Sequence, residues 1–281
     1  MKIGITGATG QLGRLVVEKL KERTSADSLV ALMRNPEKAS DLGIEGRAFD
    51  YNESAELAAS LNGIDHLLLI SSNEIGQRSI QHQNVIHAAK EAGVKWIVYT
   101  SLLHADTSSL VLAEEHLATE EALAASGIAY TILRNGWYTE NYTASIPGAL
   151  AGGALIGSAA EGKIASATRT DYAEAAAVVL IDQSHSGKVY ELAGDTTYTL
   201  ADLAAEISRQ TGKEIPYRNL SEADYAEALK GFGLPEGAAA MYASFDVGAA
   251  NNDLYDDSRQ LSALIGHPTT SLTEAVKEAL A

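Results

Sequence analysis

The amino-acid sequence predicts an α/β fold in which a parallel sheet carries helices on both faces, with a smaller, mostly helical lobe at the C-terminal end. Two observations lead to this prediction. Short apolar runs alternate with stretches of helical periodicity, and the first apolar run leads directly into a Gly-rich turn. Connections in such a sheet are right-handed crossovers, and ligands bind beyond the carboxyl ends of the strands.

The alternation can be followed along the chain. Residues 2–6 are a strand candidate, and residues 11–23 repeat leucine and valine at helical spacing. The further predicted strands are 29–33, 66–70, 96–100, 130–133 and 188–194. The further predicted helices are 54–61, 79–92, 109–125, one from about 170, and 200–211, 221–230 and 272–280. We therefore expect the functional residues in the segments that follow the strands: 7–13, 34–38, 71–76, 101–106 and 135–141.

Composition excludes several functions. The chain has 37 acidic and 21 basic residues, a net charge of -16, which argues against nucleic acid or an anionic membrane as a partner. No cysteine is present, so disulfides, thiol catalysis and thiolate metal sites are excluded. No apolar stretch is long enough for a membrane span, and the N-terminus does not look like a signal peptide. The absence of cysteine fits a reducing cytoplasm, where we expect the protein. The histidines have no metal-ligand spacing, so we expect no metal.

The strongest motif is the turn "GITGATGQLG", which contains Gly7, Gly10 and Gly13. A strand-to-helix turn of small residues lets backbone N–H groups and the helix N-terminus approach a pyrophosphate, and the last glycine permits close packing of helix on sheet. This indicates a Rossmann-type dinucleotide site. The residues expected to hold the cofactor here are Gly7, Thr9, Gly10, Gln11, Leu12 and Gly13.

The nucleotide preference is read from the end of the second strand. An NAD site usually places an Asp or Glu there to bind the ribose hydroxyls, but this sequence has Met33, Arg34 and Asn35. Arg34 can grip a 2′-phosphate, with the charge of Lys38 nearby, so the predicted cofactor is NADPH. Asp50 either accepts the adenine amino group or is an ordinary Asp that begins a turn.

The lobes are divided by a change of pattern after about Pro147, where Gly and Ala dominate. We expect residues 1–134 to form the Rossmann-type NADPH-binding domain, with residues from about 160 to 190 returning to it. Residues 135–281 would mainly form a smaller substrate-binding lobe.

Several segments together resemble one family. The Gly turn, "MRNP", "LLLISSNEIGQR", "YTSLLHADTS", "SGIAYTILRNGWYTENY" and "LIGHPTTSL" are similar to the NmrA-like atypical short-chain dehydrogenases, especially the bacterial NADPH-dependent quinone oxidoreductases of the second type, with triphenylmethane reductase as a relative. The resemblance covers essentially the whole chain. It implies hydride transfer from NADPH to a small-molecule quinone in a cleft between the two lobes.

The resemblance also implies roles for particular residues. Ser71, Ser72 and Asn73 would border the cofactor, while Gly136, Trp137, Tyr138 and Asn141 would line the nicotinamide and substrate cleft. Trp137 and Tyr138 follow a strand at the ligand-bearing edge and are suited to stacking a planar substrate, although core packing is the alternative. Arg169 could reach the cofactor, or it could be a solvated arginine.

A proton donor is not evident. Many short-chain reductases use a Tyr and a Lys at positions that here hold Leu112 and His116. His116 could donate a proton, or it could form a solvated helical pair with Glu120. A quinone needs no dedicated acid, because hydride addition gives a hydroquinone monoanion whose charge is spread over the ring. Among the other histidines, His104 is the one to test as a donor, because it follows a strand.

Two alternatives to the enzyme follow from the same residues. An NmrA-like redox sensor would bind NADP(H) without turnover, and the missing Tyr-Lys pair suits that function too. A sugar-nucleotide epimerase is disfavoured because it needs the missing pair. A homodimer is the default expectation for the assembly.

Overall fold

A computed structural model describes all 281 residues and contains a seven-stranded sheet in which every strand pairing is parallel. The strand order is β3-β2-β1-β4-β5-β6-β8. These strands are β1 Ile3–Thr6, β2 Leu29–Met33, β3 Glu45–Ala48, β4 His66–Leu69, β5 Trp96–Leu102, β6 Ala129–Asn135 and β8 Val189–Leu192. The predicted α/β fold is confirmed, and six of its seven strands lie where the apolar runs placed them. The apolar pattern missed β3, a short edge strand of sequence EGRA that has no buried residue.

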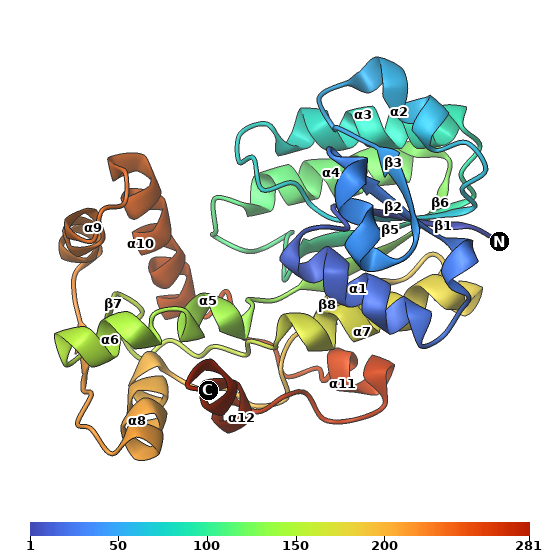
Figure 1. Cartoon of the computed structure of the whole chain (residues 1–281). Coiled ribbons are helices and arrows are strands. Elements are labelled where there is room, and N and C mark those ends of the chain that lie inside the picture. Colours follow the sequence, from blue (N-terminus) through green and yellow to red (C-terminus); the bar gives the residue numbers. More distant parts are fainter.

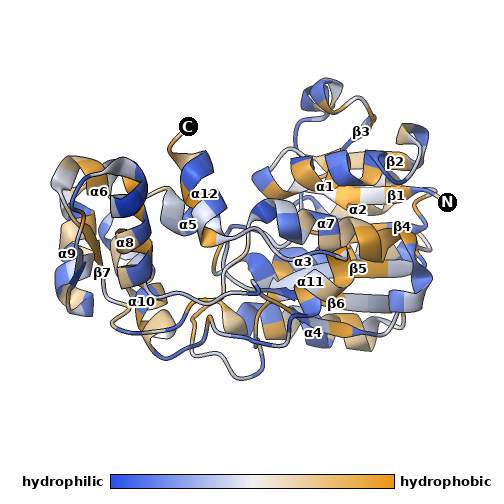
Figure 2. Ribbon diagram, turned by 90° about the horizontal axis from the view of Figure 1, so that it is seen from below, coloured by the Kyte–Doolittle hydropathy of each residue, from blue (hydrophilic) through white to orange (hydrophobic).

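Helices cover both faces of the sheet (Figure 1). One face carries α1 Gln11–Lys21, α7 Arg169–Ile181 and α11 Gln260–Ile265; the other carries α2 Ser54–Ser60, α3 Arg78–Glu91 and α4 Ala113–Ser126. Apolar side chains between these layers form the core of the sheet region, with 27 buried residues on one face of the sheet and 16 on the other. Figure 2 shows the corresponding concentration of hydrophobic residues in strands such as β1 and β5. Three short 3-10 helices, Ala26–Ser28, Pro36–Leu42 and Gln183–His185, complete this part.

The start of α4 differs from the prediction. The helix begins at Ala113 rather than at residue 109. The Ser109 backbone N–H donates to Asp253 Oδ2 at 3.1 Å, so this residue is held by a distant loop instead of the first turn of a helix.

A second core of 20 buried residues lies beside the sheet, at the carboxyl ends of its strands. It is built mainly by helices: α5 Thr139–Thr143, α6 Ile146–Gly152, α8 Leu200–Thr211, α10 Glu236–Ala250 and α12 Leu272–Ala279. Helix α9 Glu222–Gly231 has no buried residue and packs against α10. A two-stranded parallel sheet of β7 Leu155–Gly157 and β9 Tyr217–Asn219 belongs to the same region and was not predicted, because three-residue strands carry no periodicity. None of the helices is both long and apolar enough to cross a bilayer.

The chain passes between the sheet and the second core more than once. It leaves after β6, returns for α7 and β8, leaves again for α8 to α10, and returns for α11. This route places the loops after β6 and before α7 side by side, as shown by the backbone bridge between Tyr138 and Ala167.

Candidate active site

A cavity of about 650 Å³ opens at the carboxyl ends of β1, β2 and β4. The strand order places β1 between β2 and β4, so the loops after these strands meet there. The cavity is lined by Gly7, Thr9, Gly10, Gln11, Leu12, Gly13, Met33, Arg34, Asn35, Lys38, Phe49, Asp50, Tyr51, Ile70, Ser71, Ser72, Asn73, Glu74, Arg78, Gln81, Tyr138 and Arg169. The structure thus brings together the Gly turn, Arg34, Asp50, the 71–73 segment, Tyr138 and Arg169.

The Gly turn has the geometry that a phosphate needs. Gly7 adopts a positive φ of 57°, and a Cβ on Gly13 would lie 2.3 Å from the Gly7 carbonyl oxygen, so neither position suits a side chain. Gly10 precedes α1 without a side-chain cap, and the first turn of α1 holds no acidic residue. The first N–H groups of α1 are therefore available to an anion at the positive end of the helix dipole.

Arg34 lies just beyond β2, at the end of the cavity where the adenosine half of the dinucleotide is expected. Its side chain is 70% exposed, and Nη1 lies 3.7 Å from Glu74 Oε1. Lys38 is exposed on the same wall. The exposed, weakly paired guanidinium can turn to a 2′-phosphate, and no carboxylate occupies the position after β2 where NAD sites carry one.

The position of Asp50 is compatible with either of the two alternatives predicted for it. It lines the cavity, and its Oδ1 accepts a hydrogen bond from the Asn52 N–H at 3.0 Å, as in an Asx turn. Beside it, the Tyr51 hydroxyl donates to the Ile70 carbonyl at 2.8 Å, which joins the loops after β3 and β4.

The wall nearest the second core is formed by Tyr138 and Arg169. The Arg169 guanidinium carbon stands 4.4 Å from the centre of the Tyr138 ring, a cation-π contact. Arg169 Nη2 donates to Asn141 Oδ1 at 3.0 Å, and its backbone N–H donates to Glu140 Oε1 at 2.8 Å. Desolvation raises the pKa of the Tyr138 hydroxyl, and the charge of Arg169 opposes that shift. Asn141 thus lies behind Arg169 and outside the lining.

Gly136, Trp137 and His104 do not line this cavity. Gly136 is buried, and a Cβ there would lie 3.0 Å from the Tyr172 hydroxyl oxygen. Trp137 packs on the second core with its ring 5.1 Å from that of Phe245, edge to face. His104 Nε2 lies 3.1 Å from the Tyr255 carbonyl oxygen, and its backbone N–H donates to Glu191 at 2.9 Å. These three positions serve packing and loop contacts in the structure, so their functional roles remain predictions.

The interpretation of His116 and Glu120 as a solvated pair is wrong, because both side chains are buried and face different partners. His116 Nδ1 lies 2.7 Å from the Tyr99 hydroxyl, and burial lowers the pKa of the imidazole well below its usual range. Glu120 accepts two hydrogen bonds from Arg134, at 3.0 and 2.7 Å, and one from Ser101 at 2.6 Å. The acidic neighbours of His116 suggested an exposed face, but this face of α4 is turned to β5 and β6, which supply Tyr99, Ser101 and Arg134 as partners.

Sequence reasoning missed several lining residues, above all Arg78 and Gln81 of α3. Arg78 is 5% exposed, its Nη1 has no hydrogen-bond partner, and Gln81 Oε1 has none either. The signal available in the sequence was the spacing of Arg78, Gln81 and His82, which places three polar side chains on one helix face. That face is turned to the protein interior, a fact that depends on tertiary packing.

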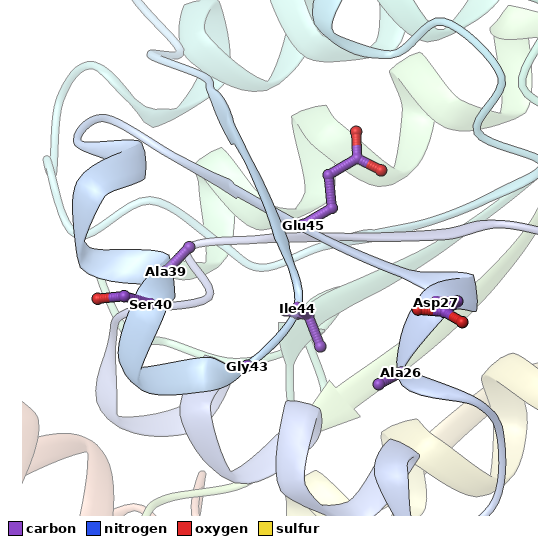
Figure 3. A pocket seen from close by; sticks show the side chains of 7 residues that line it. All are labelled: Ala26, Asp27, Ala39, Ser40, Gly43, Ile44 and Glu45. Atoms are coloured by element: carbon purple, nitrogen blue, oxygen red, sulfur yellow. The ribbon is translucent and has the colours of Figure 1, made fainter.

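A smaller cavity of about 300 Å³ lies elsewhere on the domain, between Ala26, Asp27, Ala39, Ser40, Gly43, Ile44 and Glu45 (Figure 3). It lies at the amino ends of β2 and β3, away from the ligand-bearing edge of the sheet. No three His, Asp or Glu side chains are grouped closely enough to hold a metal ion.

Comparison with known proteins gives the same assignment as the geometry. Residues 7–183 match the model of a family described as NAD(P)H-binding. Quinone oxidoreductase 2 of Escherichia coli is 60% identical over 277 residues, which cover 98% of this chain and 97% of that protein. The crystal structure of the E. coli NADPH-dependent quinone oxidoreductase in complex with NADPH superposes with a TM-score of 0.97 over 99% of this chain and 100% of that one.

A second solved structure is a more distant relative. Triphenylmethane reductase of a Citrobacter species, complexed with NADP(H), is 37% identical and has a TM-score of 0.95 over 99% of this chain and 100% of that one. The Gly turn, the arginine after β2 and these alignments agree, and the chain belongs to the NAD(P)H-binding family.

Proposed function

We propose that this protein is an NADPH-dependent quinone oxidoreductase. The observation that carries the proposal is the cavity in which the uncapped N-terminus of α1 and Arg34 lie on one lining, with no carboxylate after β2. The 60% sequence identity to the E. coli quinone oxidoreductase, which extends over nearly the full length of both chains, supports an enzyme over a nucleotide sensor without turnover.

The residues of the chain bind and orient the two reactants. The N–H groups at the start of α1 hold the pyrophosphate, and Arg34 holds the 2′-phosphate. NADPH supplies a hydride when it is bound. Tyr138 and Arg169 close the cavity wall nearest the second core and fix the face on which a planar acceptor can approach.

No side chain has to donate a proton in this reaction. Leu112 occupies the position of the Tyr of typical short-chain reductases, and His116 is buried against Tyr99 with a strongly lowered pKa. A quinone reduced by hydride becomes a stabilised phenolate that water can protonate. Good hydride acceptors, rather than ordinary ketones, are therefore the substrate class.

Residues 1–134, joined by residues from about 160 to 190, would act as the NADPH-binding domain, and most of 135–281 would act as the substrate lobe. Trp137 would line the far side of the substrate cleft after the lobes close on the ligand. The absence of cysteine suits the cytoplasm. A homodimer is expected and would be checked by light scattering.

The test is the oxidation of NADPH followed by absorbance, with and without a small benzoquinone. We expect quinone-dependent turnover that prefers NADPH to NADH. Arg34→Ala should raise the KM for NADPH by roughly 10- to 100-fold, because one charge-assisted contact to a phosphate is lost, while the KM for NADH stays unchanged. Arg218→Ala, which removes an exposed arginine outside the cavity, is the matched control. NADPH binding without turnover across several quinones and cationic dyes would refute the proposal.

A further inference from the structure

The segment Ser71–Asn73 forms part of the wall of the cofactor cavity, directly after the end of β4. Residues 70–72 belong to no helix or strand. The segment is next to the Gly turn, since a Cβ on Gly7 would lie 3.8 Å from the Ile70 Cβ. A shift of this segment would therefore change the width of the cavity beside the α1 N-terminus.

Both backbone polar groups of Ser72 are held by side chains of α3. The Ser72 N–H donates to His82 Nε2 at 2.9 Å, and the Ser72 carbonyl accepts from Arg78 Nε at 2.8 Å. Arg78 and His82 are four residues apart, one helical turn, and are 5% and 0% exposed. We propose that Arg78 and His82 are positioning residues that hold Ser72 in the conformation that binds the dinucleotide, an inference that deepens the proposed function and rests on it.

The hydrogen-bond directions determine the state of His82. A backbone N–H can only donate, so Nε2 carries a lone pair and the ring proton lies on Nδ1. Nδ1 lies 2.9 Å from Thr119 Oγ1, and that hydroxyl donates to the Glu115 carbonyl at 2.9 Å. The hydrogen bonds thus run in one direction, from the Ser72 N–H through His82 and the Thr119 hydroxyl to the Glu115 carbonyl. This order requires a neutral imidazole, because a protonated Nε2 could not accept the Ser72 N–H. Burial, followed by the charge of Arg78, lowers the pKa of His82 to about 3, which keeps the ring neutral near pH 7.

Arg78 is held from the other side by α4. Glu115 Oε1 accepts the Arg78 backbone N–H at 3.0 Å and the Gly76 N–H at 3.1 Å, and Oε2 lies 3.6 Å from Arg78 Nη1. The carboxylate thus caps the first turn of α3 and balances the buried guanidinium. The Arg78 side chain forms one hydrogen bond, from Nε to Ser72, and its Nη1 has no hydrogen-bond partner within the chain.

The experiment measures NADPH affinity directly, by fluorescence titration, and beside it the KM for NADPH and kcat with benzoquinone. His82→Leu should raise the Kd and KM for NADPH about tenfold, because the Ser72 N–H loses its acceptor, with kcat changed less than about twofold. His82→Gln, whose amide oxygen can accept the same N–H, should recover most of the affinity. Arg78→Met should act like His82→Leu, and Arg78→Lys should fall between it and the wild type.

The matched control is His116→Leu. His116 is also a buried histidine with one hydrogen-bonded neighbour, Tyr99, but it does not touch the cavity wall. It should lower the melting temperature as His82→Leu does and leave the Kd for NADPH unchanged. A His82→Leu protein that folds and binds NADPH like the wild type, or a His116→Leu protein that loses affinity to the same extent, would overturn the inference.

Two further outcomes remain informative. If His82→Leu does not fold, the comparison of Arg78→Met with Arg78→Lys decides, and equal affinities for those two variants and the wild type would refute a positioning role. If the wild type binds NADPH but reduces no quinone, the proposed reaction fails, while the Kd values still test the contacts to Ser72.

Discussion

Close backbone contacts restrict which residue types can occupy single positions of the Gly turn. The Cβ of an alanine at position 13 would lie 2.3 Å from the Gly7 carbonyl oxygen and 2.8 Å from the Ala8 Cα. Both contacts are to backbone, which cannot rotate away as a side chain can. The turn would have to open, and the N–H groups of α1 would move with it.

Gly13→Ala should therefore cost about 1 to 3 kcal/mol of unfolding free energy through overpacking, and should also lower the affinity for NADPH. Urea denaturation and an NADPH titration measure the two effects. Gly148→Ala is the control, because it lies inside α6 and a Cβ there meets nothing within 4 Å. Gly148→Ala should increase the unfolding free energy by about 0.5 to 1 kcal/mol, because alanine has a higher helix propensity than glycine. Wild-type NADPH affinity in Gly13→Ala would show that the close packing has no functional effect.

At the scale of elements, a buried carboxylate joins α10 to β7. Asp246 is 8% exposed, and its Oδ2 accepts the Ser158 N–H at 2.7 Å just after the strand. Burial raises the pKa of its carboxyl to about 6. The folded state holds this proton more tightly than the unfolded chain, whose Asp titrates near 3.8. The stabilisation from this group is therefore complete below about pH 4 and is lost as the pH rises through about 6.

Asp246→Asn keeps an oxygen acceptor for Ser158 and removes the titration. The unfolding free energy of the variant minus that of the wild type should increase by about 2 to 3 kcal/mol from pH 4 to pH 7, because the wild type loses the stabilisation from Asp246 over this range. Denaturant curves at a series of pH values measure this difference, in which the other carboxylates cancel. A difference that stays flat with pH would rule out the shifted carboxyl of Asp246.

At the scale of the whole molecule, the cofactor cavity joins segments that are distant in sequence. Its lining runs from Gly7 to Arg169, and the Arg23 guanidinium near the end of α1 is bonded to Glu174 of α7 at 2.6 Å. Such a site exists only in the folded chain. NADPH should therefore stabilise the fold by mass action, by about 2.7 kcal/mol at 100 times its Kd.

Thermal unfolding with increasing NADPH measures this effect. The melting temperature should rise by roughly 5 to 10 °C at that concentration, since about 2 to 4 °C corresponds to 1 kcal/mol for a chain of this size. Arg34→Ala at the same NADPH concentration should show a smaller rise, because fewer molecules carry ligand. Equal shifts with NADPH and NADH in the wild type would contradict the role of Arg34.

The α/β class, the Gly turn and the arginine after β2 could be predicted from the amino-acid sequence, because these features depend on local periodicity and on residues next to one another. The absence of the Tyr-Lys pair could be read from the sequence in the same way. The burial of His116 and Glu120 with different partners, and the packing of Trp137 on the second core instead of the cofactor cavity, became visible in the folded chain alone. The same is true of Arg78 and His82, whose contacts to Ser72 require α3 to pack its polar face inward. Periodicity shows which residues share a helix face, but the partner of a polar face depends on how distant segments come together in the fold.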